Sequence, residues 1–196
     1  MKTDIVLAGV GGQGILSIAT ILGTAALEEN MHIKQAEVHG MSQRGGDVQS
    51  NLRISEDPIA SDLIPLGGAD LIVSLEPMEA LRYLPYLKPQ QGWIVTNTTP
   101  FINIEKYPEQ EVLEAEMAKH DNVIAFDMDQ VAKELGTPRS SNMVLLGAAS
   151  PFIHIAADKI EDGIRKVFGA KGEKIVESNI KAFRAGREFS QNLQNK

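Results

Sequence analysis

The sequence has 196 residues, of which 43% are hydrophobic and 23% charged, with a formal net charge of −7. This length is typical of one domain with a sizeable core, and the negative charge argues against binding to nucleic acids or anionic membranes, which require a basic surface. The absence of cysteine excludes disulfides, thiol nucleophiles and the thiolate ligands of zinc or iron–sulfur clusters.

The N-terminal stretch has no signal-peptide pattern, because Asp4 and a run of glycines interrupt its hydrophobic residues. No hydrophobic run reaches the roughly 18 residues that indicate a membrane span. These features predict a cytoplasmic protein, with residues 1–196 forming a single domain.

A glycine-rich loop follows the first hydrophobic run. Residues 5–8 predict a buried strand and residues 15–27 an apolar helix, and the loop between them contains Gly9, Gly11, Gly12, Gln13 and Gly14. Three of these glycines have the G-x-G-x-x-G spacing. The first N–H groups of the following helix lack intrahelical partners and favour an anion, so the loop is a candidate phosphate or carboxylate site. The alternative is a tight turn whose glycines only allow close packing.

A second polar block follows the next predicted strand, residues 32–38. Its candidate ligand contacts are Glu37, His39, Ser42, Gln43 and Arg44. Ligands of doubly wound proteins gather outside the carboxyl ends of the strands, where this block should lie. The Arg44 guanidinium suits a phosphate or carboxylate, and the His39 imidazole can titrate near neutral pH. The alternative is an interface loop whose groups pair with one another or with a partner chain.

The rest of the chain alternates between strands and helices. Residues 47–54 alternate in polarity, which predicts a half-exposed strand near a sheet edge, antiparallel to its neighbour. Apolar runs at 69–75, 92–97 and 122–126 predict buried parallel strands. Helical patterns cover 77–84, 109–120, 127–135, 143–154, 159–168 and 173–189, and frayed residues follow from 190. The predicted fold is α/β: a three-layer, doubly wound, mostly parallel sheet with helices on both faces and C-terminal helices packed on it.

Three further polar residues are weaker candidates. Asp127 and Asp129 could bind a metal or act as acid and base, but acidic residues also favour a helix start. Asn142 is interpreted as a helix cap rather than a ligand contact.

One functional alternative is a free-standing NAD(P)-dependent oxidoreductase of the Rossmann type. Glu37 lies 23 residues after Gly14, where an acidic residue binds the adenosine ribose in such enzymes. The extra glycine in the loop and the few β-branched residues of the second strand weaken this hypothesis. No lysine near the loop completes a Walker pattern, which argues against an NTPase.

Four segments, in this order, carry a family resemblance: GVGGQG at 9–14, EVHGMSQRGG at 37–46, NLRIS at 51–55 and NMVLLG at 142–147. Together they resemble the gamma-type subunit or domain of the 2-oxoacid:ferredoxin oxidoreductases. The AEVHGMSQRGG form is most similar to the beta subunits of indolepyruvate:ferredoxin oxidoreductases. The resemblance spans about residues 3–190 and implies a fold like domain III of pyruvate:ferredoxin oxidoreductase.

The resemblance implies oxidative decarboxylation of an aryl-2-oxoacid on thiamine diphosphate, with transfer of the acyl group to coenzyme A and of electrons to ferredoxin. This chain has no cysteine for 4Fe–4S clusters, and it lacks the Gly-Asp-Gly signature for thiamine diphosphate and magnesium. These cofactors are therefore expected on a large alpha subunit, and this chain should be inactive alone. No catalytic or metal-binding residue is assigned to it, but contact with coenzyme A is implied.

Overall fold

The computed structural model describes residues 1–39 and 45–194. Within that part of the chain, six strands form one sheet in the order β2-β3-β1-β4-β5-β6. They are β1 (Lys2–Val10), β2 (His32–His39), β3 (Asp47–Ser55), β4 (Leu71–Ser74), β5 (Trp93–Asn97) and β6 (Val123–Phe126). The helices are α1 (Ile15–Glu28), α2 (Pro77–Arg82), α3 (Gln110–Met117), α4 (Met128–Glu134), α5 (Ser141–Ala149), α6 (Ala157–Phe168) and α7 (Glu173–Gln194).

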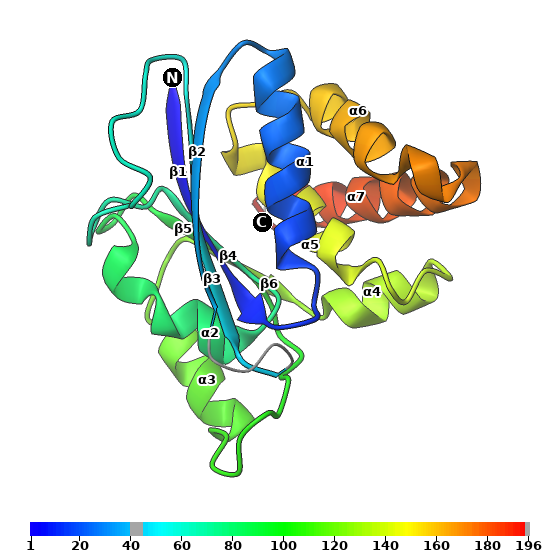
Figure 1. The fold of residues 1–196 in the computed structure, drawn as a ribbon. Coiled ribbons are helices and arrows are strands. Elements are labelled where there is room, and N and C mark those ends of the chain that lie inside the picture. The colour runs from blue at the N-terminus through cyan, green and yellow to red at the C-terminus, as the bar shows by residue number, and fades with distance from the viewer. Residues whose placement is uncertain (40–44, 195–196) are drawn as a thin grey trace.

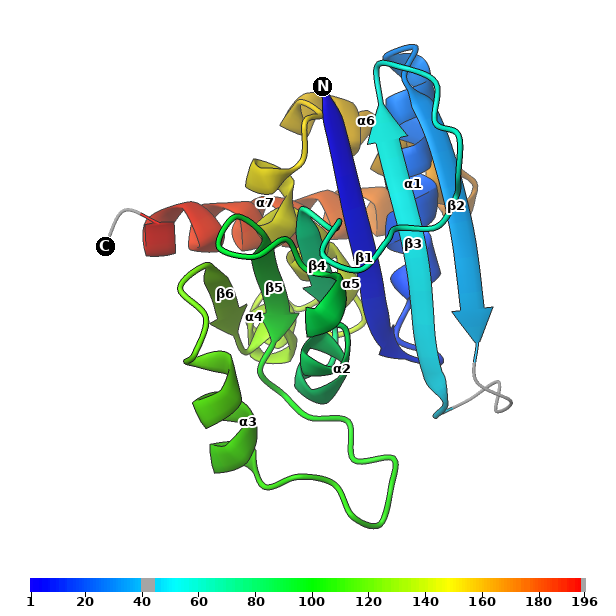
Figure 2. The same cartoon turned by 90° about the vertical axis from the view of Figure 1, so that its left-hand side faces the viewer.

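The sheet is mixed but mostly parallel. β1, β4, β5 and β6 pair in parallel, whereas β3 lies antiparallel between β1 and β2. Figure 2 shows the sheet from its face, with β2 and β6 at the two edges. The predicted α/β class, the parallel apolar strands and the antiparallel strand are thus confirmed.

Helices cover both faces of the sheet. α1 and α4–α7 lie on one side, and α2 and α3 lie on the other (Figure 1). The larger hydrophobic core lies under the first group and includes Ile18, Leu71 and Phe183. The smaller core lies under α2 and α3 and includes Val6 and Ile94. β1 contributes to both cores because successive side chains of a strand point to opposite faces.

β3 differs from its prediction as a half-exposed strand. It is paired on both sides, and its side chains are buried from Ser50 onward. Arg53 lies beside Asp4 of β1, and its Nε donates to Asp4 Oδ1 at 2.8 Å. The same guanidinium donates to the carbonyl oxygens of Ser61 and Leu63, so the loop after β3 covers this polar face. The alternating pattern was therefore misleading, because these polar side chains pair inside the protein.

Helices α5 and α7 cross at two glycines. A Cβ atom on Gly147 would lie 1.9 Å from the Phe183 carbonyl oxygen, and one on Gly186 would lie 1.9 Å from that of Val144. Only glycine allows the two backbones to approach this closely. α7 continues to Gln194 and buries Ser190 completely, so the fraying predicted from residue 190 is wrong. No helix in the described ranges is long and apolar enough to cross a membrane.

Candidate functional site

The glycine loop lies at the point where the connections of the sheet diverge. From β1 the chain passes through α1 to β2 on one side, and from β4 it passes through α2 to β5 on the other. β1 and β4 are neighbours, so their carboxyl ends form a topological switch point, where doubly wound folds bind ligands. The loop after β1 lies on one side of this switch point, and the turn after β4 lies on the other.

The loop glycines serve different purposes. A Cβ atom on Gly9 would lie 2.9 Å from Gln13 Oε1 and 3.0 Å from Ile15, so Gly9 allows close packing. Gly12 and Gly14 have positive φ angles of 103° and 86°, which L side chains rarely adopt. No atom of residues 1–39 or 45–194 lies within 4 Å of a Cβ built on Gly12, so this part of the structure leaves the backbone there open. The loop combines the packing role and the open surface that were considered as alternatives.

Gln13 holds the loop in shape. Its Oε1 accepts a hydrogen bond from Val10 N at 2.7 Å, and its Nε2 donates to the Leu75 carbonyl oxygen at 3.2 Å. The side chain therefore connects the loop to the end of β4. Its amide therefore positions the loop, and the ligand contact predicted for Gln13 stays a prediction.

The first turn of α1 favours an anion. Gly14 is the N-cap residue, no side chain caps the helix, and this turn, all of which is described, has no acidic residue. The Ser17 N–H group turns back to the Gly14 carbonyl oxygen, at 3.1 Å. No carboxylate of the first turn of α1 itself therefore offsets the positive end of the helix dipole, which faces the switch point.

Asn142 is a site residue that the sequence pattern assigned differently. It is the second residue of α5, and Ser140 occupies the N-cap position, so the prediction that Asn142 caps the helix is wrong. Instead its Nδ2 donates to the Gly14 carbonyl oxygen at 3.3 Å, and a Cβ on Gly14 would lie 2.7 Å from the same nitrogen. Asn142 thus supports the glycine loop from a segment 128 residues away, for which no local sequence signal exists.

The polar block after β2 returns to the glycine loop. Glu37 is exposed near the end of β2 and accepts a hydrogen bond from Gln35 Nε2 at 2.6 Å. Gly11 N donates to the Gly46 carbonyl oxygen at 2.8 Å, which places the end of the block against the loop. The backbone of His39 ends β2, but its side chain and the residues Ser42, Gln43 and Arg44 lie outside the described part of the structure.

The strand order weighs against the dinucleotide hypothesis. In the Rossmann arrangement the second strand lies beside the first, so its acidic residue reaches the ribose. Here β3 separates β2 from β1, which places Glu37 about 10 Å from β1 instead of about 5 Å. Glu37 therefore does not occupy the position from which the acidic residue of a Rossmann fold binds the ribose.

A buried carboxylate, Glu76, lies directly after β4. Its side chain is completely buried and caps α2 by accepting from Glu79 N at 2.8 Å. Its other oxygen accepts from the Tyr107 hydroxyl and from Phe101 N, the latter at 3.4 Å. Burial and the bond to Glu76 raise the pKa of the Tyr107 hydroxyl. The sequence pattern identified Glu76 only as the start of a helix, because its other partners lie 25 and 31 residues away.

Two charged side chains, Glu79 and Arg82, lie in helix α2, close to Glu76. Glu79 is buried and pairs with Arg82, whose Nε lies 2.8 Å from Glu79 Oε2. Burial raises the pKa of Glu79 although Arg82 opposes the shift, and the nearby Glu76 and Asp47 carboxylates raise it further. The turn after β4 is thus an acidic region whose charges are held by hydrogen bonds.

The remaining acidic candidates have structural roles. Asp127 caps α4 by accepting from Gln130 N at 2.8 Å, and Asp129 accepts from Asn97 Nδ2 at 2.8 Å. The interpretation of Asp127 as a helix start is therefore confirmed. Among the residues that the structure describes, no group of three or more His, Asp or Glu side chains is placed to hold a metal ion.

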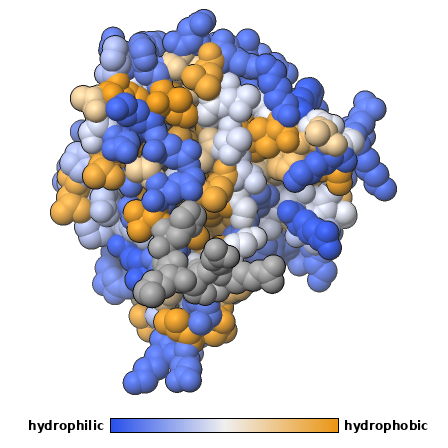
Figure 3. Space-filling view, in the orientation of Figure 1, coloured by the Kyte–Doolittle hydropathy of each residue, from blue (hydrophilic) through white to orange (hydrophobic). Residues whose placement is uncertain are grey.

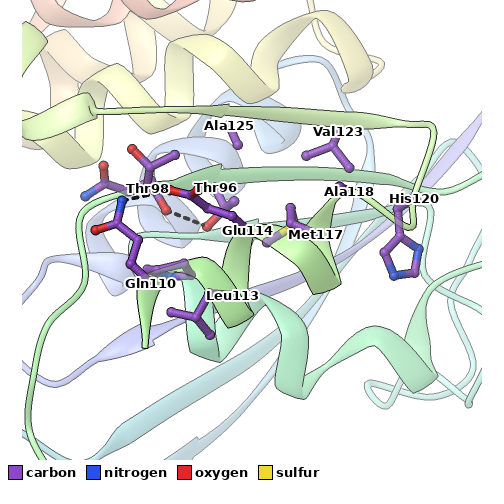
Figure 4. A pocket seen from close by; sticks show the side chains of 12 residues that line it. Thr96, Thr98, Gln110, Leu113, Glu114, Met117, Ala118, His120, Val123 and Ala125 are labelled. Atoms are coloured by element: carbon purple, nitrogen blue, oxygen red, sulfur yellow. Dashed lines mark hydrogen bonds between the residues drawn. The ribbon is translucent and has the colours of Figure 1, made fainter. Parts of the chain in front are cut away.

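A separate apolar cavity of about 250 Å³ lies between α3 and the strands β5 and β6. Leu113, Met117 and Val123 form much of its wall, with Thr98 and Gln110 at one end and His120 at the other (Figure 4). None of the predicted site residues appears among its described lining residues. The cavity is not part of the site at the switch point.

Comparison with known proteins identifies relatives over nearly the whole chain. The chain is 37% identical to an indolepyruvate oxidoreductase subunit IorB of Pyrococcus horikoshii, and the alignment covers 98% of each. It is 38% identical to the IorB subunit of Thermococcus kodakarensis, over 93% of each chain. It is also 28% identical to a 2-oxoglutarate synthase subunit KorC of Methanocaldococcus jannaschii. These matches confirm the resemblance found in the four sequence segments.

Solved structures share the fold. The gamma subunit of a keto/oxoacid ferredoxin oxidoreductase from Geobacter sulfurreducens aligns with a TM-score of 0.71 and 24% identity, over 97% of this chain and 99% of that one. The 2-oxoglutarate:ferredoxin oxidoreductase of Magnetococcus marinus, solved with 2-oxoglutarate, coenzyme A and succinyl-CoA, aligns with a TM-score of 0.75 and 22% identity. That alignment covers 97% of the present chain but only 31% of the Magnetococcus marinus chain. Since residues 4–189 also match the family model, the chain belongs to the pyruvate ferredoxin/flavodoxin oxidoreductase family.

Proposed function

We propose that this chain is the small, gamma-type subunit of a 2-oxoacid:ferredoxin oxidoreductase that acts on aryl-2-oxoacids such as indolepyruvate. The observation that carries the proposal is the end-to-end identity of 37–38% with subunits named for indolepyruvate oxidoreductase. In the proposed reaction the oxoacid loses carbon dioxide, its acyl group passes to coenzyme A, and two electrons pass to ferredoxin. Residues 1–196 act as one domain in this subunit.

The reactive centres belong to a large partner subunit in this proposal. The residues of this chain do not fit an iron–sulfur cluster, because the sequence contains no cysteine. The sequence also lacks the Gly-Asp-Gly signature of a thiamine diphosphate and magnesium site. Thiamine diphosphate, magnesium and 4Fe–4S clusters are therefore assigned to the large subunit.

The role proposed for this chain is to receive coenzyme A at the switch point. The backbone at Gly12, open within the described residues, and the N-terminus of α1, whose first turn has no acidic residue, suit the diphosphate of the ligand. In this proposal the Arg44 guanidinium supplies positive charge, and Glu37, His39, Ser42 and Gln43 supply further polar contacts. A relative of the same fold was solved with coenzyme A, which supports this assignment.

The test is co-expression with a candidate large subunit that carries the signatures for thiamine diphosphate and 4Fe–4S clusters. We expect the two chains to co-purify and to reduce ferredoxin in a reaction that requires coenzyme A, faster with indolepyruvate than with pyruvate or 2-oxoglutarate. The small chain alone should be colourless and inactive. Full activity of the large subunit alone, or a preference for pyruvate, would contradict the proposal. Saturable binding of NAD(H) or NADP(H) by the small chain in calorimetry would instead support the Rossmann-type alternative.

A further inference from the structure

The carboxylate of Glu76 has no part in the function proposed above, yet it is completely buried at the switch point. A buried carboxylate is stable only when hydrogen bonds replace its hydration. Glu76 obtains them from three places: Glu79 N in its own helix, Phe101 N and the Tyr107 hydroxyl. Two of these three donors belong to one segment that is distant in sequence.

That segment, residues 98–108, contains no helix or strand. It leaves the carboxyl end of β5 and extends beyond the sheet before α3 begins (Figure 2). A connection of this length has many accessible conformations, so fixing it requires specific contacts. Glu76 provides two such contacts near opposite ends of the segment, at Phe101 and Tyr107.

Between those two anchors, the segment reaches the glycine loop. Asn103 Nδ2 donates to the Gly45 carbonyl oxygen at 2.7 Å, and Gly45 N lies 3.5 Å from the Gly11 carbonyl oxygen. Hydrogen bonds at Phe101, Tyr107 and Asn103 thus link Glu76, by way of the backbone of segment 98–108 and of Gly45, to the loop proposed to bind coenzyme A. Phe101, Ile102 and Ile104 flank Asn103 and are 43%, 73% and 48% exposed. Hydrophobic surface is visible at this lower end of the molecule in Figure 3.

We propose that Glu76 is a positioning residue which, through Tyr107, holds segment 98–108 as a preformed wall of the coenzyme A site. This inference rests on the proposed function. A wall that is already in place lowers the entropy lost on binding and so raises affinity without touching the reacting atoms. A loss of the tether should therefore appear in the KM for coenzyme A and not in the kcat.

The experiment uses the two-subunit complex with the substitution Tyr107→Phe, which removes only the hydroxyl donor. We expect the KM for coenzyme A to rise about three- to tenfold, the range for loss of one hydrogen bond to a charged group in a partly redundant anchor. The kcat and the KM for the oxoacid should stay within about twofold. The matched control is Tyr86→Phe, because the Tyr86 backbone contacts Ala69 at the opposite, amino end of β4.

A conservative variant separates tethering from folding. Glu76→Gln retains one oxygen that can accept from Tyr107 and Phe101, but it loses the oxygen that caps α2. It should lower the thermal stability of the complex while raising the KM for coenzyme A less than Tyr107→Phe does. The inference is overturned if an active wild-type complex that requires coenzyme A shows an unchanged KM on Tyr107→Phe, or if the kcat falls with the KM unchanged. A wild-type complex that does not assemble or does not use coenzyme A overturns the proposed function instead.

Discussion

Gly147 and Gly169 are glycines in helical backbone whose surroundings differ completely. A Cβ on Gly147 would lie 1.9 Å from a backbone oxygen of α7. Among the residues that the structure describes, no atom lies within 4 Å of a Cβ on Gly169, whose φ is −54°. We predict that Gly147→Ala lowers the free energy of unfolding by about 1–3 kcal/mol or more through overpacking. Gly169→Ala should raise it by about 0.4–1 kcal/mol, because alanine restricts the unfolded chain. Urea denaturation of the isolated chain measures both values.

Because the two substitutions should change the free energy of unfolding in opposite directions, each serves as the control for the other. Equal effects of the two substitutions, or a neutral Gly147→Ala, would show that α5 and α7 do not cross as closely as the structure places them. The m-values should match those of the wild type, since neither substitution changes the surface exposed on unfolding.

Single residues also show where prediction from sequence reached its limit. Gly9, Gly12 and Gly14 could be located because a strand, a turn and a helix are local patterns. Asn142 and Glu76 could not, since their contacts with Gly14 and with residues 101–107 join distant segments. Gln13 was found by its place in the loop, but its use as an internal connector depends on the Leu75 carbonyl group across the switch point.

At the scale of elements, helix α1 allows a test of the dipole argument. Leu16 lies in its first turn and is 38% exposed, and Leu27 lies in its last turn and is 62% exposed. We predict that Leu16→Glu stabilises the isolated chain by about 0.3–1 kcal/mol while Leu27→Glu destabilises it by a similar amount, because a negative charge favours only the N-terminal end. Urea denaturation at low ionic strength measures this difference.

The same two variants test the ligand site in the assembled complex. Leu16→Glu places a negative charge where the diphosphate of coenzyme A is proposed to lie, so the KM for coenzyme A should rise. Leu27→Glu introduces the same charge at the other end of the helix and should leave that KM unchanged. A rise with both variants, or with neither, would argue against an anion at the N-terminus of α1.

The strands show why the burial of a strand is harder to predict from sequence than its position. β4 and β5 are short and largely buried, whereas β6, at the sheet edge, is buried only at alternate positions. The parallel pairing of all three follows from the connections between them. The position and the antiparallel direction of β3 were predicted correctly, but its burial was not. Its polar side chains suggested solvent, yet Arg53 is only 9% exposed because Asp4 and two carbonyl groups receive its donors.

For the whole molecule, the Asp4–Arg53 pair predicts how stability depends on pH. Burial disfavours ionisation of Asp4, but the bonds from Arg53 and Lys2 outweigh it and hold the pKa of this carboxyl below its ordinary value. The unfolded chain therefore takes up this proton at a higher pH than the folded chain. The stability that the pair contributes is present above about pH 4, the ordinary aspartate value, and is lost as the pH falls through the lower folded value.

The reference for this measurement is the double variant Asp4→Asn/Arg53→Gln, which has no titrating group at either position. We predict that the wild type exceeds it in free energy of unfolding at pH 7 and that the difference shrinks as the pH falls below about 4. Asp4→Asn alone should cost about 3–5 kcal/mol, because it leaves the Arg53 charge buried without its partner. A difference that stays constant between neutral and acidic pH would contradict this account.

At this largest scale, the α/β architecture was predictable because alternating strands and helices permit few arrangements. The family could be identified because four separate segments occur in a fixed order, and the relatives found over nearly the whole length agree with it. The insertion of β3 between β1 and β2 was not predictable, because a strand's neighbours depend on contacts across the whole sheet. That insertion is also what distinguishes this sheet from a dinucleotide-binding one.

The close crossing of α5 and α7 has a consequence for biosynthesis. α5 lies on β4 and β5, and α7 contacts it more extensively than its other helical neighbours, α1 and α4, do. Until residue 186 has left the ribosome, the hydrophobic surface of α5 beside Gly147 lacks this cover and is a binding surface for chaperones. The surface that α5 and α7 form together therefore becomes available to another subunit only after translation has passed residue 186.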